Sequence, residues 1–314
     1  MKKILYTRNT TGQDYLADCV FQGLRNLDDL EVTDAPRMWY MYSSEFKPHG
    51  SRNLSDIYGR GFTMWGYMEE TPIDRENIEQ KIIDHYFDLI IFSRTDETSP
   101  YLDLILKHYN ADEIIALSGR DEIHIEPKLL GNSSYFIREI INEPINGIYP
   151  GGRHWPPFEN NKVFPISFGF PKVKIQTPLP KVRPWSNVQP GWGAHYVHHN
   201  EQDYYDDYRQ SLFGRTTKKA GWDCMRHYEI IACRCIPYFA DLAGAPRNLM
   251  TTLPRDLLLH AKRRVDEQGV EYFMPGQPGW NEYQELEQKI FDHFLANCTT
   301  DSLAKYVLDT HYGR

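Results

Sequence analysis

Short apolar runs alternate with amphipathic stretches along the first half of the chain. Residues 3–7 form an apolar run, apolar residues recur at helical spacing from Tyr15 to Leu24, and residues 30–32 form a second run. This order of strand, helix and strand predicts a parallel sheet with a right-handed crossover. Residues 87–93 carry the strongest strand pattern, an apolar run typical of a strand that is buried on both faces.

The same alternation continues on both sides of an irregular stretch. Residues 36–72, which are rich in Tyr, Gly and Met, are predicted to form an insertion or a long functional loop. Further elements of the first half are expected as a helix at 74–85, a helix before residue 113, and strands at 113–117, 134–137 and 163–166. Five prolines between Pro171 and Trp192 indicate a linker or the lip of a second domain.

Helix and strand patterns resume beyond the proline-rich segment. The expected elements are helices at 201–210 and 224–233, strands at 211–213 and 235–239, and a closing helical pair at 281–296 and 301–309. The fold class predicted from both halves is α/β, with two Rossmann-like lobes facing a cleft. The predicted boundaries are an N-terminal lobe at 1–170, a linker or cleft lip at 171–200 and a C-terminal lobe at 201–314.

The composition supports a folded, water-soluble chain of about two domains. Its 314 residues are 41% apolar and 25% charged, which excludes a disordered, collagen-like or coiled-coil chain. No apolar run reaches the roughly 18 residues of a membrane span, and the start of the chain turns polar too soon for a signal peptide. Five scattered cysteines, an odd number, favour reduced thiols and a cytoplasmic location.

The net charge of -8 disfavours duplex nucleic acid as a partner, because an acidic chain repels polyphosphate unless its cations are gathered in one place. Cations do gather in the second half. There a loop with Lys218, Lys219 and Gly221 leads into a predicted helix whose first turn presents Arg226 and His227. A helix N-terminus offers free N–H groups and a positive dipole end, so this segment is a candidate phosphate site.

Glu229 lies one turn further along the predicted helix, where its carboxylate can accept two hydroxyls such as those of a ribose. The alternative interpretation is purely structural. In that case the two lysines form a solvated turn, and Glu229 caps the helix or pairs with Arg226. The residues alone leave both interpretations open.

Residues 226–237 resemble the donor-site helix of glycosyltransferases with the GT-B fold, and the exostosin-like group is the nearest match. The shared pattern is an Arg or similar polar residue, then Glu and Ala, a few apolar residues, Gly-Cys and an apolar-Pro strand. The resemblance covers mainly residues 201–260, about a fifth of the chain. Arg234 departs from the pattern, because it stands where the family usually has Gly.

The resemblance implies a transferase that moves a sugar from a nucleotide-sugar donor to a saccharide or another hydroxyl acceptor. In such an enzyme Glu229 holds ribose or sugar hydroxyls, and the cations of the preceding loop and first helical turn hold the diphosphate. Asp223 occupies the region where the larger family often has a second acidic residue, and it joins the donor-site candidates.

The implied chemistry needs no metal. Cleavage of the bond between the anomeric carbon and the diphosphate places negative charge on the leaving phosphate, which cations and helix N–H groups stabilise. The other major glycosyltransferase fold uses Asp-x-Asp to hold a divalent metal, and that motif does not occur in this sequence. We therefore expect no metal and no cofactor apart from the nucleotide-sugar co-substrate.

Acceptor binding is expected in the N-terminal lobe, because loops of that lobe bind the acceptor in GT-B enzymes. The candidates are Gly59, Arg60, Gly61, Phe62 and Thr63, a segment whose glycines permit close approach of the backbone to a ligand. A pair of β-turns with buried aromatic residues is the alternative interpretation of this segment.

Polar residues follow the strands predicted at 87–93 and 113–117. Ligands of open α/β sheets lie beyond the carboxyl ends of the strands, so Arg94 is a further candidate for acceptor binding. An inverting transferase also needs a base for the acceptor hydroxyl. The candidates for this base are Asp96 and Asp121, followed by His49. Ordinary ion pairs between loops are the alternative.

Two other functions fit the same features. One is a glycan- or nucleotide-binding protein that has the same fold and no catalytic activity. The other is a different Rossmann-type enzyme that acts on a phosphorylated small molecule. The chain has neither Gly-x-Gly-x-x-Gly after its first strand nor a P-loop, so it lacks the usual nucleotide fingerprints of that class.

Overall fold

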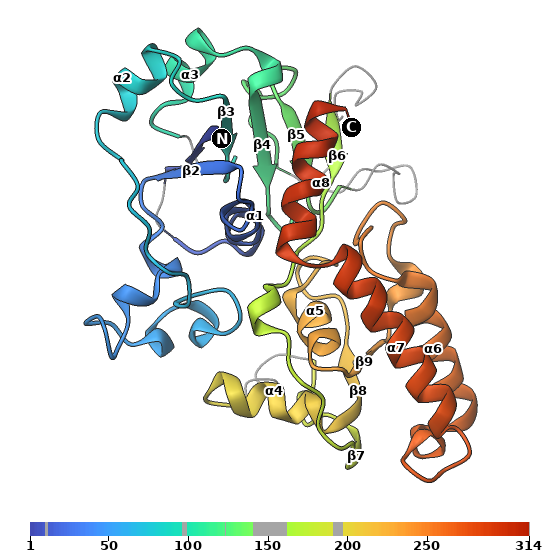
Figure 1. Ribbon diagram of the computed structural model, residues 1–314. Coiled ribbons are helices and arrows are strands. Elements are labelled where there is room, and N and C mark those ends of the chain that lie inside the picture. The colour runs from blue at the N-terminus through green and yellow to red at the C-terminus, as the bar shows by residue number, and fades with distance from the viewer. Residues whose placement is uncertain (10–11, 96–98, 123, 141–161, 191–196, 314) are drawn as a thin grey trace.

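A computed structural model shows an α/β protein built on two parallel sheets (Figure 1). The structure describes residues 1–9, 12–95, 99–122, 124–140, 162–190 and 197–313. Asp96, one of the predicted bases, lies outside the described residues. Within the described ranges, none of the helices combines the length and the apolar character needed to cross a bilayer.

The larger sheet has the strand order β2-β1-β3-β4-β5-β6, with every neighbouring pair parallel. Its strands are β1 (Lys2–Thr7), β2 (Leu30–Ala35), β3 (Leu89–Phe92), β4 (Ile114–Ser118), β5 (Ser134–Ile137) and β6 (Val163–Pro165). The six predicted strands of the first half are thus confirmed. The order places the topological switch point, next to which ligands of such sheets bind, between β1 and β3.

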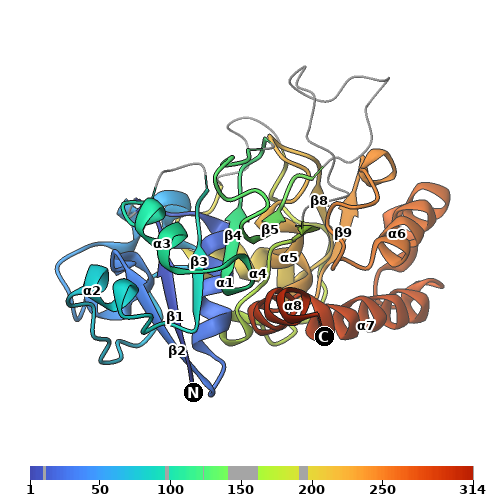
Figure 2. The same cartoon turned by 90° about the horizontal axis from the view of Figure 1, so that it is seen from above.

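Alternate residues of the central strands face two different cores. Leu89 and Ile91 belong to the core under the first helix, whereas Ile90 and Phe92 belong to the core on the opposite face. This period of two follows from the pleat of a strand. A helical layer therefore covers each face of the sheet (Figure 2), as a Rossmann-like organisation requires. The helices of these layers are α1 (Tyr15–Arg25) on the first face, and α2 (Ile78–Ile83) and α3 (Leu102–His108) on the second.

The smaller sheet has three parallel strands in the order β7-β8-β9. Its strands are β7 (Arg183–Trp185), β8 (Ser211–Thr216) and β9 (Ile236–Phe239). Its helices are α4 (Glu201–Arg209), α5 (Met225–Ala232), α6 (Arg255–Gln268) and α7 (Trp280–Asn297). Strand β7 lies inside the proline-rich segment for which a linker or cleft lip is predicted.

The last helix leaves the small sheet and returns to the large one. Helix α8 (Thr300–Tyr312) packs across α1 (Figure 1). The Tyr306 hydroxyl donates to the carbonyl of Pro165 over 2.5 Å, and His311 Nδ1 lies 2.8 Å from Ser134 Oγ. The covering of the N-terminal sheet is therefore completed by the C-terminal end of the chain.

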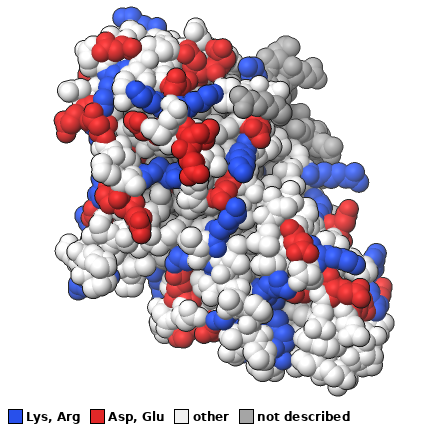
Figure 3. Space-filling view, in the orientation of Figure 1, with Lys and Arg blue, Asp and Glu red and all other residues white. Residues whose placement is uncertain are grey.

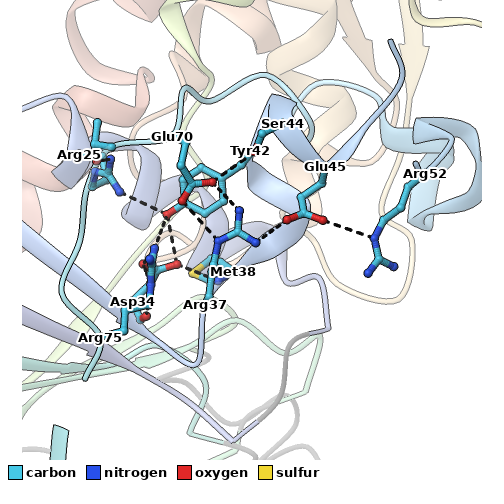
Figure 4. Close-up of polar contacts among 11 residues, drawn as sticks. Arg25, Asp34, Arg37, Met38, Tyr42, Ser44, Glu45, Arg52, Glu70 and Arg75 are labelled. Carbon is cyan, nitrogen blue, oxygen red and sulfur yellow. Dashed lines mark hydrogen bonds and ion pairs between the residues drawn. The ribbon is translucent and has the colours of Figure 1, made fainter. Parts of the chain in front are cut away.

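The predicted insertion at 36–72 is a series of short helical turns anchored at the end of β2. Asp34 is fully buried and accepts hydrogen bonds from the Met38 backbone N–H (2.7 Å), the Tyr42 hydroxyl (3.1 Å) and Arg75 (2.6 Å) (Figure 4). Arg37 pairs with Glu45 and Glu70 in the same view. Because a buried carboxylate is costly unless hydrogen-bonded, this cluster fixes where the insertion leaves the sheet. The turns are η1 (Trp39–Met41), η2 (Ser43–Glu45), η3 (Leu54–Asp56) and η4 (Tyr58–Gly61).

Candidate functional site

Surface charge alone does not single out a site. On the face shown in Figure 3, basic and acidic side chains are interspersed over both halves of the molecule. The candidate site is instead defined by buried polar groups, where the carboxyl ends of the central strands of the large sheet meet the amino end of α5.

Arg138, directly after β5, joins the two halves at this point. Its side chain is 2% exposed and donates to the carbonyls of Asp223 (2.6 Å) and Gly119 (2.9 Å) and to Glu139 Oε1 (2.8 Å). Glu139 Oε1 in turn accepts from the Asp223 backbone N–H over 2.9 Å. A Cβ at Gly221 would lie 2.6 Å from this same oxygen, so only glycine fits there without a shift. The segment before α5 is thus held against the large sheet.

Asp223 is a buried carboxylate at the same junction. One oxygen, Oδ2, accepts from the backbone N–H of Phe168 over 2.9 Å. Burial raises the pKa of Asp223 to about 6, and the positive charge of Arg138 opposes that rise. This predicted donor residue therefore acts in the structure as part of the connection between the sheets.

The predicted bases and Arg94 lie in different settings. Asp121 pairs with Arg138 while half of its side chain stays exposed, which places it at the junction. Arg94 follows β3, and its Nε lies 3.8 Å from Asp14 Oδ2, at the start of α1. His49 is exposed in a turn of the insertion, where its backbone N–H donates to Phe46. Among the described residues, no contact joins His49 to the other candidates.

Arg226 occupies the first turn of α5. Its side chain is 7% exposed, and the buried nitrogen Nη1 has no hydrogen-bond partner among the described residues. The helix starts after Cys224, whose side chain makes no capping hydrogen bond. A guanidinium and the positive end of a helix thus lie together, with hydrogen-bonding capacity that the described part of the chain leaves unused.

His227, the next residue, is a neutral group in this structure. Its Nε2–H donates to the carbonyl of Trp222 (3.0 Å), so Nδ1 accepts from the Thr216 hydroxyl (2.9 Å). Burial lowers the pKa of His227 to about 4. His227 therefore orders the loop between β8 and α5, and neither ring nitrogen is available to a phosphate.

Lys218 and Lys219 are exposed in that loop. The Lys218 backbone N–H donates to Asp241, and its ammonium lies 5.2 Å from the centre of the Trp222 ring. Thr217 Oγ1 also donates to Asp241 Oδ2 over 2.9 Å. The loop backbone is thus fixed by the end of β9, while both lysine side chains reach solvent.

Glu229 is bound by two hydroxyl groups of the protein itself. Its Oε1 accepts from Thr63 Oγ1 and its Oε2 from the Tyr204 hydroxyl, each over 2.6 Å. Burial raises the pKa of Glu229, and the two hydrogen bonds oppose that rise. The structure therefore brings a predicted acceptor residue and a predicted donor residue, 166 positions apart, into direct contact.

The rest of the predicted acceptor segment lies against the same region. Arg60 donates to the carbonyl of His198 over 3.1 Å, and Phe62 packs on Tyr204 with ring centres 5.6 Å apart. Gly59 and Arg60 both have a φ of 59° and Gly61 one of 74°, so the chain turns sharply there. The segment is a strained turn, and its aromatic residue is packed against α4.

Sequence reasoning missed three residues that define the site. Arg138 and Arg8 each follow a buried strand directly, and this position at a carboxyl end was a usable signal. All three guanidinium nitrogens of Arg8 are buried without a hydrogen bond to the described part of the chain, and Asp18 Oδ1, the carboxylate oxygen that pairs with Nη1, is 3.7 Å away. Tyr204 gave no such signal, because its role depends on a contact between distant segments.

The described residues contain no group of three or more His, Cys, Asp or Glu side chains arranged to hold a metal ion. No protein-family model matches the chain. Comparison with curated proteins likewise finds no significant relative, so the functional interpretation depends on the residues of the site themselves.

Proposed function

We propose that this protein is a glycosyltransferase that moves a sugar from a nucleotide-sugar donor to a hydroxyl acceptor, with cations and helix N–H groups taking the place of a catalytic metal. The observation that carries the proposal is Arg226, a nearly buried guanidinium in the first turn of α5 with a donor that no described residue accepts. The leaving diphosphate is the kind of group that such a site stabilises.

The proposed arrangement is that of a GT-B fold, with the two sheets as lobes and the substrates between them. Arg226, the start of α5 and the exposed side chains of Lys218 and Lys219 hold the diphosphate. Glu229 accepts hydrogen bonds from hydroxyls of the nucleotide-sugar, in the same way as it now accepts them from Thr63 and Tyr204. The unpaired state of all five cysteines supports a reducing, cytoplasmic compartment.

The acceptor hydroxyl needs a base. Asp121 supports this role, because half of its side chain remains accessible beside Arg138. The same ion pair also favours a second candidate function, a nucleotide- or glycan-binding protein without turnover, since a carboxylate held by Arg138 is less free to contact an acceptor hydroxyl. That alternative predicts nucleotide binding with no sugar transfer.

The test is ligand-dependent thermal unfolding with ADP, CDP, GDP and UDP, each with and without EDTA. One nucleotide is expected to raise the unfolding temperature selectively and in the presence of EDTA, because a ligand of the folded state stabilises it by RT ln(1 + [L]/Kd). Arg226→Met is expected to weaken binding of that nucleotide about ten- to a hundredfold, the worth of a hydrogen bond to a charged group.

Without ligand, Arg226→Met is expected to unfold at a lower temperature, because the Arg226 charge stabilises the buried carboxylate of Glu229, so nucleotide affinity is the decisive readout. Arg263→Met is the matched control, because Arg263 is exposed on α6. A flat response to all four nucleotides contradicts the proposed function. Equal nucleotide affinity in Arg226→Met removes Arg226 from the site.

A further inference from the structure

Thr63 is held in a backbone conformation that its side chain disfavours. Its φ is 68°, in the left-handed region, and its side chain is fully buried. A β-branched residue in this region is a genuine outlier, and such strain persists only where the surroundings impose it. Strained residues of this kind cluster at ligand clamps and switches, so the contacts that impose the conformation matter.

Those contacts come from the C-terminal half of the chain. The Thr63 backbone N–H donates to Glu201 Oε1 over 2.6 Å, and its hydroxyl donates to Glu229 Oε1 over 2.6 Å. Tyr205 lies 2.7 Å from Thr63 Oγ1 and 3.0 Å from Glu201 Oε1, so its single proton can serve either oxygen. Lys174 pairs with the other oxygen of Glu201. The strain at Thr63 is therefore balanced by contacts with α4 and α5.

The position that Thr63 occupies is the one a ligand needs. Both oxygens of Glu229 are taken, one by Thr63 and one by Tyr204, at distances suited to a pair of hydroxyls. Arg226, three residues earlier on α5, lies on the neighbouring part of the same helix surface and has an unused donor. A ligand that binds Arg226 through its phosphates therefore brings its hydroxyls to the carboxylate of Glu229, both of whose oxygens already accept hydrogen bonds.

We propose that Thr63 gates this site. Its hydroxyl occupies Glu229 in the structure, and binding of a ligand with a pair of hydroxyls displaces it and releases the turn 59–63. The gate rests on the proposed function, because it takes the ligand to be a nucleotide or nucleotide-sugar with a ribose diol.

The turn 59–63 can move without the residues that follow it. Gly59 and Gly61 have φ values of 59° and 74°, so glycines interrupt the turn at two points. Apart from Thr63, the turn contacts the C-terminal half mainly through Arg60, on the carbonyl of His198 and on His199 Nδ1, and through the packing of Phe62 on Tyr204. Met64 and Trp65, directly after the turn, are fully buried, and Trp65 Nε1 donates to Asp18 over 2.7 Å, so the core anchors the chain there. Release of Thr63 would also relieve its left-handed strain, which offsets part of the free energy lost with the Glu229 hydrogen bond.

The experiment compares wild type, Thr63→Ala, Thr63→Ser and the control Thr71→Ala by calorimetric titration with ADP, CDP, GDP and UDP. Thr63→Ala lacks the competing hydroxyl and is expected to bind the preferred nucleotide about tenfold more tightly. Thr63→Ser keeps the hydroxyl and should bind like wild type. Thr71 lies near the end of the insertion with its hydroxyl on Arg25, and its replacement should change nothing.

Two further measurements separate the possible causes. The gain in Thr63→Ala should be smaller for the 2′-deoxy form of the preferred nucleotide, which lacks one of the two hydroxyls. In wild type, the nucleotide should accelerate amide hydrogen exchange in residues 59–63. Equal or weaker binding by Thr63→Ala, or unchanged or slower exchange in 59–63, overturns the gate and leaves the proposed function standing. Failure of all four nucleotides to bind overturns both.

Discussion

His227 shows how a single buried residue gives the fold a pH dependence. Its ordinary pKa of 6.5 falls to about 4 in the folded protein because burial disfavours the charged ring. Above pH 6.5 the ring is neutral in both states and has no effect. As the pH falls from 6.5 to 4, the unfolded chain binds a proton that the folded protein does not, and the free energy of unfolding decreases.

We therefore predict that the protein loses stability as the pH falls, and that His227→Gln makes this loss smaller. The wild type should lose up to about 3 kcal/mol between pH 6.5 and 4 through this residue, and the variant should lose correspondingly less. Urea unfolding followed by tryptophan fluorescence at several pH values measures the difference. His49→Gln, at an exposed position, is the control. Identical pH slopes in wild type and His227→Gln contradict the prediction.

The comparison with a variant is needed because other buried groups act in the opposite direction. Burial raises the pKa of Asp18 to about 7 and that of Asp223 to about 6. The folded protein holds these protons at pH values where the unfolded chain has released them, so ionisation of both aspartates opposes folding as the pH rises. The free energy of unfolding of the wild type therefore depends on pH through both the histidine and the aspartates. The difference between wild type and His227→Gln isolates the contribution of the histidine.

At the scale of elements, the contact between α1 and α8 depends on a glycine. A Cβ at Gly23 would lie 2.0 Å from the carbonyl oxygen of Thr300 and 2.9 Å from Ala304 Cβ. Both helices would have to separate to accept it. The glycine costs α1 some helix propensity, which the close approach of α8 outweighs.

Gly23→Ala is expected to destabilise the protein by about 2 kcal/mol, the usual size of an overpacking penalty, despite the better helix propensity of alanine. Gly244→Ala is the matched control, because a Cβ there meets only the Trp222 ring at 3.7 Å. Thermal and urea unfolding of the two variants give the measurement. A Gly23→Ala protein as stable as wild type shows that α8 shifts on α1 at little cost.

The elements also show what can be predicted from the sequence. The apolar run around β3 predicts a buried strand, because Leu89–Phe92 has no polar face to expose. Strand β7 could not be predicted in the same way, since Arg183–Trp185 contains a proline and is a strand only through its pairing with β8. Arg226 could be identified as a site candidate from local sequence spacing alone. The hydrogen bond between Thr63 and Glu229 depends on the tertiary fold, which local spacing does not determine.

At the scale of the whole molecule, the two halves share one hydrophobic core. Ile4 and Leu89 of the large sheet belong to the same buried cluster as Phe213 and Ile236 of the small sheet. Backbone hydrogen bonds join Phe170 to Cys298, at the end of α7, and to Thr300, the first residue of α8. The N-terminal sheet is therefore covered in part by the C-terminal end of the chain, although its strands are contiguous in sequence.

We predict that residues 1–170 alone do not fold cooperatively, and that fusing residues 299–313 in front of Met1 restores cooperative folding. Helix α8 buries Leu303 and Val307, worth about 3–6 kcal/mol by side-chain burial, a large part of the stability of an ordinary domain. Lys2 Nζ lies 3.8 Å from the centre of the Tyr312 ring, so a short linker can join α8 to the start of β1. Urea unfolding of both polypeptides is the measurement. A cooperative transition for 1–170 alone would show that the large sheet does not depend on α8. A fusion without a cooperative transition would show that the large sheet depends instead on contacts with the small sheet.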